Sequence, residues 1–391
     1  MCAGSPSGPP SGSGPIARAA QKRLADLRAR CLLRTLTPVP AGAVNLCSND
    51  YLGLLSDAAW QGELRRTIDR DAGAGASRLL GGEDPVFAEL ESAFSQFKDA
   101  PASLLFPSGY AANESVVQTL AGLEAHFFSD QLNHASIIDG CRLARLGRDR
   151  VHVFAHADLD QLRSQLNACP ASNKVIITES VFSMDGDAAD LPALYELAQS
   201  HQALLVIDEA HAMGVWGRAG RGWIDHAGLS AAGVVSVNTL GKAWGLQGAI
   251  VSGPEWFRQL LINEARPFIY TTGCSPWLAD AALQTLKRMP HWETRRCRVR
   301  ELAERLRRGL CGAGFAIDIS DSPIVPVIVG AATAALDLSR YLLERGFFCR
   351  PVRPPTVPEG TCRVRLSLTA AIRAEQLDRL LRAIVAWGDR R

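Results

Sequence analysis

The sequence predicts an α/β protein with a large unit built on a mainly parallel sheet and a smaller α+β unit after it. Two observations lead to this prediction. Between about residues 85 and 280, helical stretches alternate with short apolar strands, and the strands near Lys174 and Ala203 are continuously apolar. Continuous apolarity is typical of strands that are buried on both faces. After about residue 285, a long charged helix leads into shorter strands and helices.

The elements can be placed along the chain in order. A stretch rich in Ala, Leu and Arg predicts a helix over 15–36. The predicted strands of the large unit are 102–106, 125–129, 151–154, 174–178, 203–207, 234–237 and 248–251. In the C-terminal unit we expect helices over 294–310, 333–345 and 374–387, and strands over 324–329 and 363–368. The expected organisation is a disordered tail (1–14), a helix and arm (15–60), the large unit (61–285) and the small unit (286–391).

Composition excludes several classes of protein. The net charge of +2 provides no broad basic field, so we expect no nucleic-acid partner. No apolar run approaches the roughly 20 residues that span a bilayer, so we expect no membrane partner. The N-terminus lacks the layout of a signal peptide and the ten cysteines form no CxxC pair, which indicates reduced thiols in a cytoplasmic protein without a metal site.

An acid and an imidazole follow the strand predicted at 203–207. Asp208 ends this strand and His211 comes three residues later. Ligands of open α/β sheets bind outside the carboxyl ends of the strands, so both side chains are expected where a cofactor would lie. A surface turn with a capping aspartate is an equally good interpretation of this segment alone.

A lysine follows the strand predicted at 234–237. Lys242 lies between Gly241 and Gly245, and a buried lysine becomes a nucleophile that forms Schiff bases. The segment is not a phosphate-binding P-loop, because Ala243 stands where that motif has Ser or Thr. A solvated loop lysine is the alternative.

Three further strand ends carry polar groups. The run SGYAAN at 108–113 follows a strand and begins a helix, which forms an anion site when backbone N–H groups remain free. His134 follows the next strand, where a structural role is the alternative. Asp185 and Asp187 follow another, but the intervening Gly186 makes a turn the better interpretation than a metal site.

Together these strand ends supply an anion site, an imidazole, an acid and a lysine, the set that pyridoxal 5'-phosphate (PLP) requires. The sequence resembles the α-oxoamine synthases, PLP enzymes of the aspartate-aminotransferase fold (fold type I), over nearly all of residues 17–388. The motifs that carry the resemblance are SNDYLG at 48–53, SGYAAN at 108–113, VFSMDGD at 181–187, DEAH at 208–211 and TLGK at 239–242.

The resemblance implies roles for individual residues. The catalytic residues would be Lys242, His134 and Asp208, with Lys242 carrying PLP and Asp208 facing its pyridine nitrogen. The cofactor-binding residues would be Gly109, Tyr110, His134, Ser183, Asp208, His211, Thr239, Lys242 and Thr272, the last reaching the cofactor of a second protomer in a homodimer. The substrate-binding residues would be Arg34, Asn49, His134, Arg353 and Thr356, with Arg353 on the amino-acid carboxylate.

The resemblance also implies a reaction, the decarboxylating Claisen condensation of L-alanine with a pimeloyl thioester to give 8-amino-7-oxononanoate in biotin biosynthesis. The thioester would be carried by CoA or by acyl carrier protein. The runs GAGASR at 73–78 and RPPTVP at 353–358 favour this acyltransferase, whereas Gly81, Ala212, Met213 and the pair Gly273-Cys274 depart from its pattern. The alternatives are a sister enzyme that uses glycine or serine with another acyl-CoA, and an aminotransferase.

Overall fold

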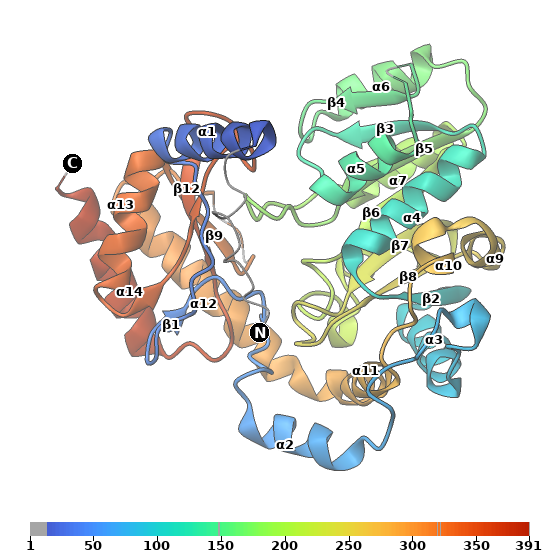
Figure 1. Ribbon diagram of the computed structural model, residues 1–391, viewed down its shortest axis with the longest axis horizontal. Helices are drawn as coiled ribbons and strands as arrows, with labels where there is room; N and C mark the ends of the chain where they lie inside the picture. The colour runs from blue at the N-terminus through green and yellow to red at the C-terminus, as the bar shows by residue number, and fades with distance from the viewer. Residues whose placement is uncertain (1–13, 148, 319, 321, 391) are drawn as a thin grey trace, which may run out of the picture.

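The computed structural model describes residues 14–390 apart from 148, 319 and 321, so most of the predicted tail lies outside the described residues. A seven-stranded sheet forms the centre of the larger part (Figure 1). Its strands, in spatial order, are β2 (Ala102–Phe106), β8 (Ala249–Gly253), β7 (Val234–Thr239), β6 (Leu204–Asp208), β5 (Lys174–Glu179), β3 (His126–Asp130) and β4 (Val151–Phe154). The run from β7 to β4 is parallel, and β8 pairs antiparallel with both of its neighbours.

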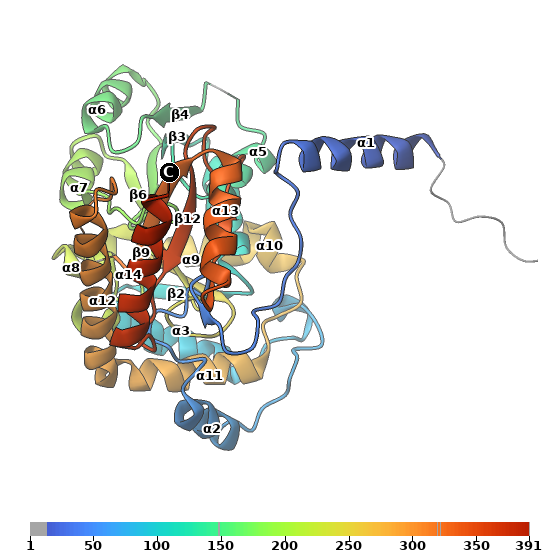
Figure 2. The same ribbon diagram turned by 90° about the vertical axis from the view of Figure 1, so that its left-hand side faces the viewer.

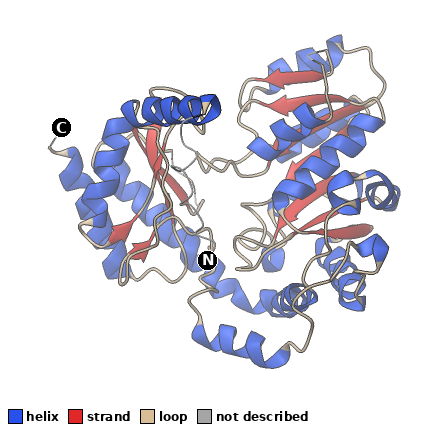
Figure 3. Cartoon of the chain, in the orientation of Figure 1, coloured by secondary structure: helices blue, strands red, loops and turns tan. Residues whose placement is uncertain are grey.

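Helices cover both faces of this sheet (Figure 3). They are α3 (Pro85–Lys98), α4 (Gly109–Gly122), α5 (Ala135–Leu143), α6 (Leu159–Ala168), α7 (Leu191–Ser200), α8 (Trp223–His226), α9 (Glu255–Glu264) and α10 (Arg266–Ile269). Neighbouring residues of one strand belong to different apolar clusters: Phe127 and Val206 lie in one, Phe128 and Ile207 in the other. The strands are therefore buried on both faces, as their continuous apolarity predicted.

The smaller part contains an antiparallel sheet of β11 (Pro351–Val352), β12 (Cys362–Ser367) and β9 (Ile324–Gly330), in that order. It is covered by α12 (Glu293–Gly312), α13 (Ala332–Leu343) and α14 (Ala374–Gly388). Two short strands, β1 (Val44–Asn45) and β10 (Phe347–Phe348), pair beside it. The first helix, α1 (Pro15–Ala29), projects from the body and buries no residue (Figure 2).

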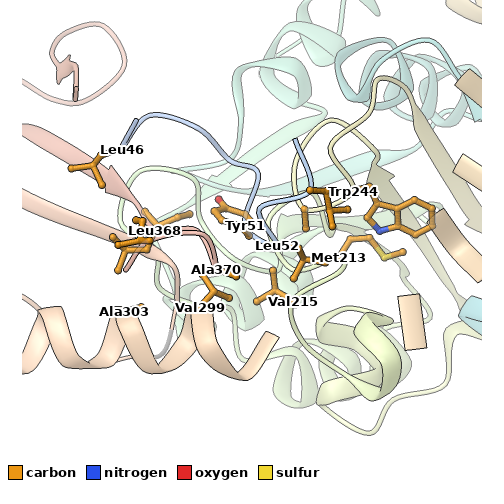
Figure 4. Packing of buried hydrophobic residues seen from close by; sticks show 14 of the residues in the cluster. Leu46, Tyr51, Leu52, Met213, Val215, Trp244, Val299, Ala303, Leu368 and Ala370 are labelled. Atoms are coloured by element: carbon orange, nitrogen blue, oxygen red, sulfur yellow. The ribbon is translucent and has the colours of Figure 1, made fainter. Parts of the chain in front are cut away.

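The N-terminal arm and α11 (Pro276–Arg288) connect the two parts. α2 (Ala58–Thr67) follows the arm, and α11 leads into the small part, so residue 285 falls within a helix. In Figure 4, Leu46 and Tyr51 of the arm lie among side chains of α12, of the strand end at Leu368 and of the loop that carries Trp244. One apolar cluster thus runs through both parts, and it holds the arm between them.

The predicted strands agree with the observed strands to within about two residues at each end, and the predicted α/β class with a mainly parallel sheet is confirmed. The helix predicted over 15–36 was wrong at its C-terminus, because α1 ends at Ala29 and Cys31 adopts a left-handed φ of 57°. The sequence analysis did not identify β1, β10 and β11, which are two residues long. Among the described residues, no helix combines the length and the apolar character that crossing a bilayer requires.

A buried ion pair supports the strand end that carries Asp208. The ammonium group of Lys98 donates to the carboxylate of Glu209 and to the carbonyl of Arg221, and both Lys98 and Glu209 are buried. Glu209 also accepts the N–H of Ile224 at 2.9 Å. The pair fixes the chain immediately after β6 to the end of α3.

Replacement of Lys98 by Met should lower the free energy of unfolding by about 3–5 kcal/mol, because Glu209 then remains as a buried, unpaired charge. Urea denaturation measures the loss. The control Lys22→Met changes an exposed residue of α1 and should stay within about 0.5 kcal/mol of the parent. A loss below about 1 kcal/mol for Lys98→Met would show that the pair contributes little.

Candidate functional site

The carboxyl ends of the parallel strands bring together most of the predicted cofactor residues. Glu179 ends β5 and Asp208 ends β6, and the two residues are direct partners in the strand pairing. Thr239 ends β7, and Lys242 follows three residues later. His134 follows β3 and caps α5. This convergence results from the parallel pairing, which places all these strand ends on one side of the sheet.

Asp208 is buried and is held in a hydrogen-bond network. The side-chain amide of Asn113 donates to its carboxylate at 2.7 Å, and the N–H of Ala210 donates at 2.8 Å. Asn113 also donates to Oγ of Ser136 at 2.9 Å, and this oxygen lies 2.7 Å from Nδ1 of His134. The N–H of Ser136 donates to the same Nδ1, so this nitrogen is an acceptor and Nε2 of His134 carries the proton. Asn113 and Ser136 therefore join the acid to the imidazole.

Lys242 carries a free amine. It is partly buried, and among the described residues its Nζ has no hydrogen-bond or ion-pair partner. Desolvation lowers the pKa of Lys242 to about 8, although the nearby carboxyl groups of Asp208 and Glu179 act in the opposite direction. A substantial fraction of the amine is therefore neutral near pH 8, the form that acts as nucleophile or base.

Glu179 is a second buried carboxyl group at the same place. Burial raises its pKa well above the usual range, and the charge of Asp208 raises it further. Its Oε1 is buried and has no hydrogen-bond partner among the described residues. Burial and the neighbouring carboxyl group therefore both favour the protonated form of Glu179.

His211 is oriented by a tyrosine from the N-terminal arm. The hydroxyl of Tyr51 lies 2.6 Å from Nδ1 of His211, and it also donates to Oδ1 of Asn49 at 3.3 Å. Burial lowers the pKa of His211 well below its usual value, so the ring is neutral. Burial also raises the pKa of Tyr51 to about 12, so its hydroxyl keeps its proton.

The first turn of α4 provides the predicted anion site. Ser108 caps the helix by accepting the N–H of Ala111 at 3.1 Å. Gly109 faces Thr239, and a Cβ at this glycine would lie 3.6 Å from the Thr239 side chain. The ring of Tyr110 lies edge-on to that of His134, with their centroids 6.4 Å apart. Free N–H groups at a helix start beside a hydroxyl are a suitable binding site for a phosphate group.

The small part contributes a buried arginine, which the sequence analysis did not select. Nε of Arg365, on β12, donates to the carbonyl of Ser183 at 2.5 Å, and Nη1 donates to Oδ1 of Asn49 at 3.1 Å. Nη2 is buried and has no partner among the described residues. A guanidinium group with one unsatisfied nitrogen can bind a carboxylate.

The other predicted substrate residues form a separate group. Arg34 donates to Oγ1 of Thr356 at 3.3 Å. The guanidinium of Arg353 binds the main-chain carbonyls of Cys31 and Leu33 with two of its five N–H groups. Thr272 is exposed, and no hydrogen bond of the described residues joins it to the group around Lys242.

Comparison with known proteins agrees with this geometry. The model of the class I and II aminotransferase family matches residues 41–384. An 8-amino-7-oxononanoate synthase of Methylococcus capsulatus is 43% identical over 88% of this chain and 89% of its own, and one of an Anaeromyxobacter species is 42% identical over 93% and 94%. The chain belongs to the α-oxoamine synthase branch of the class I and II aminotransferase family.

Solved α-oxoamine synthases have the same fold. A serine palmitoyltransferase of S. paucimobilis, with a bound PLP–myriocin aldimine, has a TM-score of 0.84 at 27% identity and covers 96% of this chain and 97% of its own. The 8-amino-7-oxononanoate synthase of Francisella tularensis has a TM-score of 0.76 at 28% identity and covers 89% and 98%. The predicted family and fold are therefore confirmed, and the family is PLP-dependent.

The residues of this chain fit PLP. The unpartnered amine of Lys242 and the buried carboxylate of Asp208 match a carbonyl and a pyridinium nitrogen. The start of α4 beside Thr239 matches a phosphate. The network residues Asn113 and Tyr51 lie within motifs quoted for the family, whereas Ser136 lies outside them, and only the structure reveals their bonds.

The loop that carries Ser183 is anchored by a charged histidine. His156 follows β4, and its Nδ1 lies 3.0 Å from Oδ1 of Asp130 while its Nε2 lies 2.7 Å from Oδ2 of Asp187. The Phe182 ring packs edge-on at 4.4 Å. Hydrogen bonds to the two carboxylates raise the pKa of His156 to about 10.

This raised pKa predicts a pH-dependent contribution to stability. It should be fully present below about pH 6.5 and lost as pH rises through 10, because the folded state then releases the proton. Urea denaturation of the parent and of His156→Gln should differ by about 2–4 kcal/mol at pH 6, with the difference shrinking towards pH 10. His201→Gln is the control, and a His156→Gln difference that stayed constant with pH would contradict the ionic role.

Proposed function

We propose that this protein catalyses the decarboxylating condensation of L-alanine with a pimeloyl thioester, which yields 8-amino-7-oxononanoate, CO2 and the free thiol. The reaction class rests on one observation, the unpartnered amine of Lys242 beside the buried Asp208. The choice of substrates rests on the name shared by relatives that are about 42% identical over most of the chain.

Bound PLP supplies an electron sink that stabilises negative charge at the amino-acid Cα. Lys242 would hold PLP covalently, and its amine, with a pKa of about 8, is suited to removing the Cα proton. Asp208 would face the pyridine nitrogen, and Asn113 keeps the carboxyl group of Asp208 in place. His211 would face the ring hydroxyl.

His134 donates from Nε2. Because Ser136 occupies Nδ1, the remaining proton points away from that contact and is available to a substrate oxygen. We assign His134 to the face of the cofactor ring and to the thioester carbonyl that gains charge when the new C–C bond forms. Assistance of this kind is worth about 10²–10⁴-fold in rate.

The amino-acid carboxylate has two candidate partners. Arg353, the residue expected from the sequence, binds the carbonyls of Cys31 and Leu33 with two of its N–H groups. Arg365 has a buried, unpartnered Nη2 next to Asn49. We assign the carboxylate of L-alanine to Arg365, and Arg353 to the support of the segment that carries Arg34 and Thr356 beside the acyl chain.

The acyl carrier and the assembly follow from the same proposal. Arg142 and Arg145 lie at the end of α5, where a basic surface would suit an acidic carrier protein, whereas Arg150 binds carbonyls of Ala121 and Ala125.

We propose a homodimer in which the exposed Thr272 reaches the cofactor of the second protomer. The nine described cysteines are free thiols, which suits the reducing cytoplasm.

The substrate assignment can be tested by thiol release. Pimeloyl-CoA should release CoA with L-alanine and at least about tenfold more slowly with glycine or L-serine, since one small group is worth about 10–200-fold in a fitted pocket. Lys242→Ala should lower the rate by about 10²–10⁴-fold and abolish the visible absorption of covalently bound PLP. Lys287→Ala, an exposed change on α11, is the control.

The other outcomes identify the alternatives. Faster release with glycine or serine and another acyl-CoA would indicate a sister enzyme, a possibility that the serine palmitoyltransferase neighbours favour. Formation of a 2-oxo acid without thiol release would indicate an aminotransferase. Retention of the absorption band in Lys242→Ala would overturn the assignment of this lysine.

The carboxylate assignment needs a comparison of two variants. Arg365→Lys should raise the KM for L-alanine by about tenfold or more with a smaller effect on kcat, because lysine cannot reproduce the fork of donors. Arg353→Lys should affect the KM for the acyl substrate instead. Steady-state kinetics with each substrate varied measures both, and the reverse pattern would return the carboxylate to Arg353.

A further inference from the structure

Three side chains of ligand type meet at the end of the sheet opposite the catalytic residues. His126 begins β3, His152 lies on β4 and Cys169 caps the C-terminus of α6. Nδ1 of His126 lies 3.2 Å from Nε2 of His152 and 3.6 Å from Sγ of Cys169. All three ligand atoms lie within 4.8 Å of one another.

The pairing of the strands explains this meeting. His152 pairs with Phe128, and His126 lies two residues before Phe128, so all three rings occupy one face of the sheet. The ring of Phe128 stacks on that of His152 with centroids 4.7 Å apart. Leu166 of α6 belongs to the same apolar cluster as Phe128, and this packing brings Cys169 over the two imidazoles.

The distances match those of a tetrahedral metal centre. Zinc binds imidazole nitrogen at about 2.0–2.1 Å and thiolate sulfur at about 2.3 Å. At a tetrahedral angle these bond lengths place two nitrogens about 3.3 Å apart and a nitrogen and a sulfur about 3.6 Å apart. The observed separations of 3.2 and 3.6 Å lie close to both values.

The chemistry of the three ligands also selects the metal. Two imidazoles and a thiolate suit zinc and similar borderline ions, and they do not suit magnesium or calcium, which prefer oxygen. The apolar cluster around Cys169 shields one side of the group.

We propose that His126, His152 and Cys169 form a Zn²⁺ site at the amino-terminal end of the sheet, with water as the fourth ligand. Binding would replace the contact between the two imidazoles and release the thiol proton of Cys169 to solvent. The sequence analysis expected no metal because the cysteines form no CxxC pair, whereas these three ligands are spread over 44 positions.

The site would stabilise the edge of the sheet rather than take part in the reaction. His126 and Asp130 lie at opposite ends of β3, roughly 13 Å apart at about 3.3 Å per residue. β4 is an edge strand, and its Val153 is 53% exposed. A metal bound by residues of β3, β4 and α6 would fix this edge, which is otherwise open to unwanted strand pairing.

Zinc titration of the metal-free, PLP-loaded protein against a competing chromophoric chelator tests the proposal. We expect one Zn²⁺ per chain and a rise of a few degrees in Tm. His152→Phe and Cys169→Ser should each weaken binding by at least about tenfold and remove the Tm shift. The matched controls His201→Gln and Cys297→Ser change a histidine and a cysteine outside the group and should bind zinc like the parent.

A second measurement uses the unaltered protein, so its result does not depend on whether the variants fold. Zn²⁺ should slow the alkylation of Cys169 by iodoacetamide and leave that of Cys297 unchanged, as mass spectrometry can resolve. Co²⁺ should give the visible bands of a tetrahedral thiolate complex. Equal zinc binding by all variants would overturn the proposal, and so would alkylation of Cys169 that does not respond to Zn²⁺. The variants should retain enzyme activity, so the test does not depend on it.

Discussion

Asp208 and Glu179 end neighbouring parallel strands, so two carboxyl groups are buried side by side at one point of the sheet. Two negative charges at this buried place would cost much free energy, and the neighbouring side chains reduce that cost. The pKa of Glu179 is raised, Asn113 donates to Asp208, and the amine of Lys242 lies near both carboxyl groups. A cofactor with a cationic pyridine nitrogen fits the buried carboxyl group of Asp208.

The small part completes this arrangement from the other side. Arg365 binds the carbonyl of Ser183 and the side chain of Asn49, and Arg363 pairs with Asp185 in the same loop. Two arginines of one strand therefore hold the loop whose opposite end His156 anchors through Asp187. The apolar core also continues from the arm into both parts. We therefore expect that a shift of either part would alter the positions of the site residues.

The two ends of the sheet serve different purposes. The carboxyl ends of β3, β5, β6 and β7 carry the proposed catalytic groups, and His134, Asp208 and Lys242 lie there with polar or charged neighbours. At the amino ends, His126 and His152 lie against an apolar cluster and contact Cys169. One pair of strands thus carries the proposed catalytic imidazole at one end and the proposed metal site at the other.

Most of the fold and half of the site could be predicted from the sequence. Continuous apolar runs determine the strands of a doubly covered sheet, and polar residues at their ends identified Asp208, His134 and Lys242, because local pattern is sufficient where topology places the strand ends together. Only the tertiary structure decided that Arg365 keeps a buried nitrogen without a partner, that Tyr51 contacts His211, that Asn113 joins Asp208 to Ser136, and that Cys169 meets two histidines. These contacts join residues 20 to 320 positions apart, and their geometry depends on side-chain packing that no local pattern records.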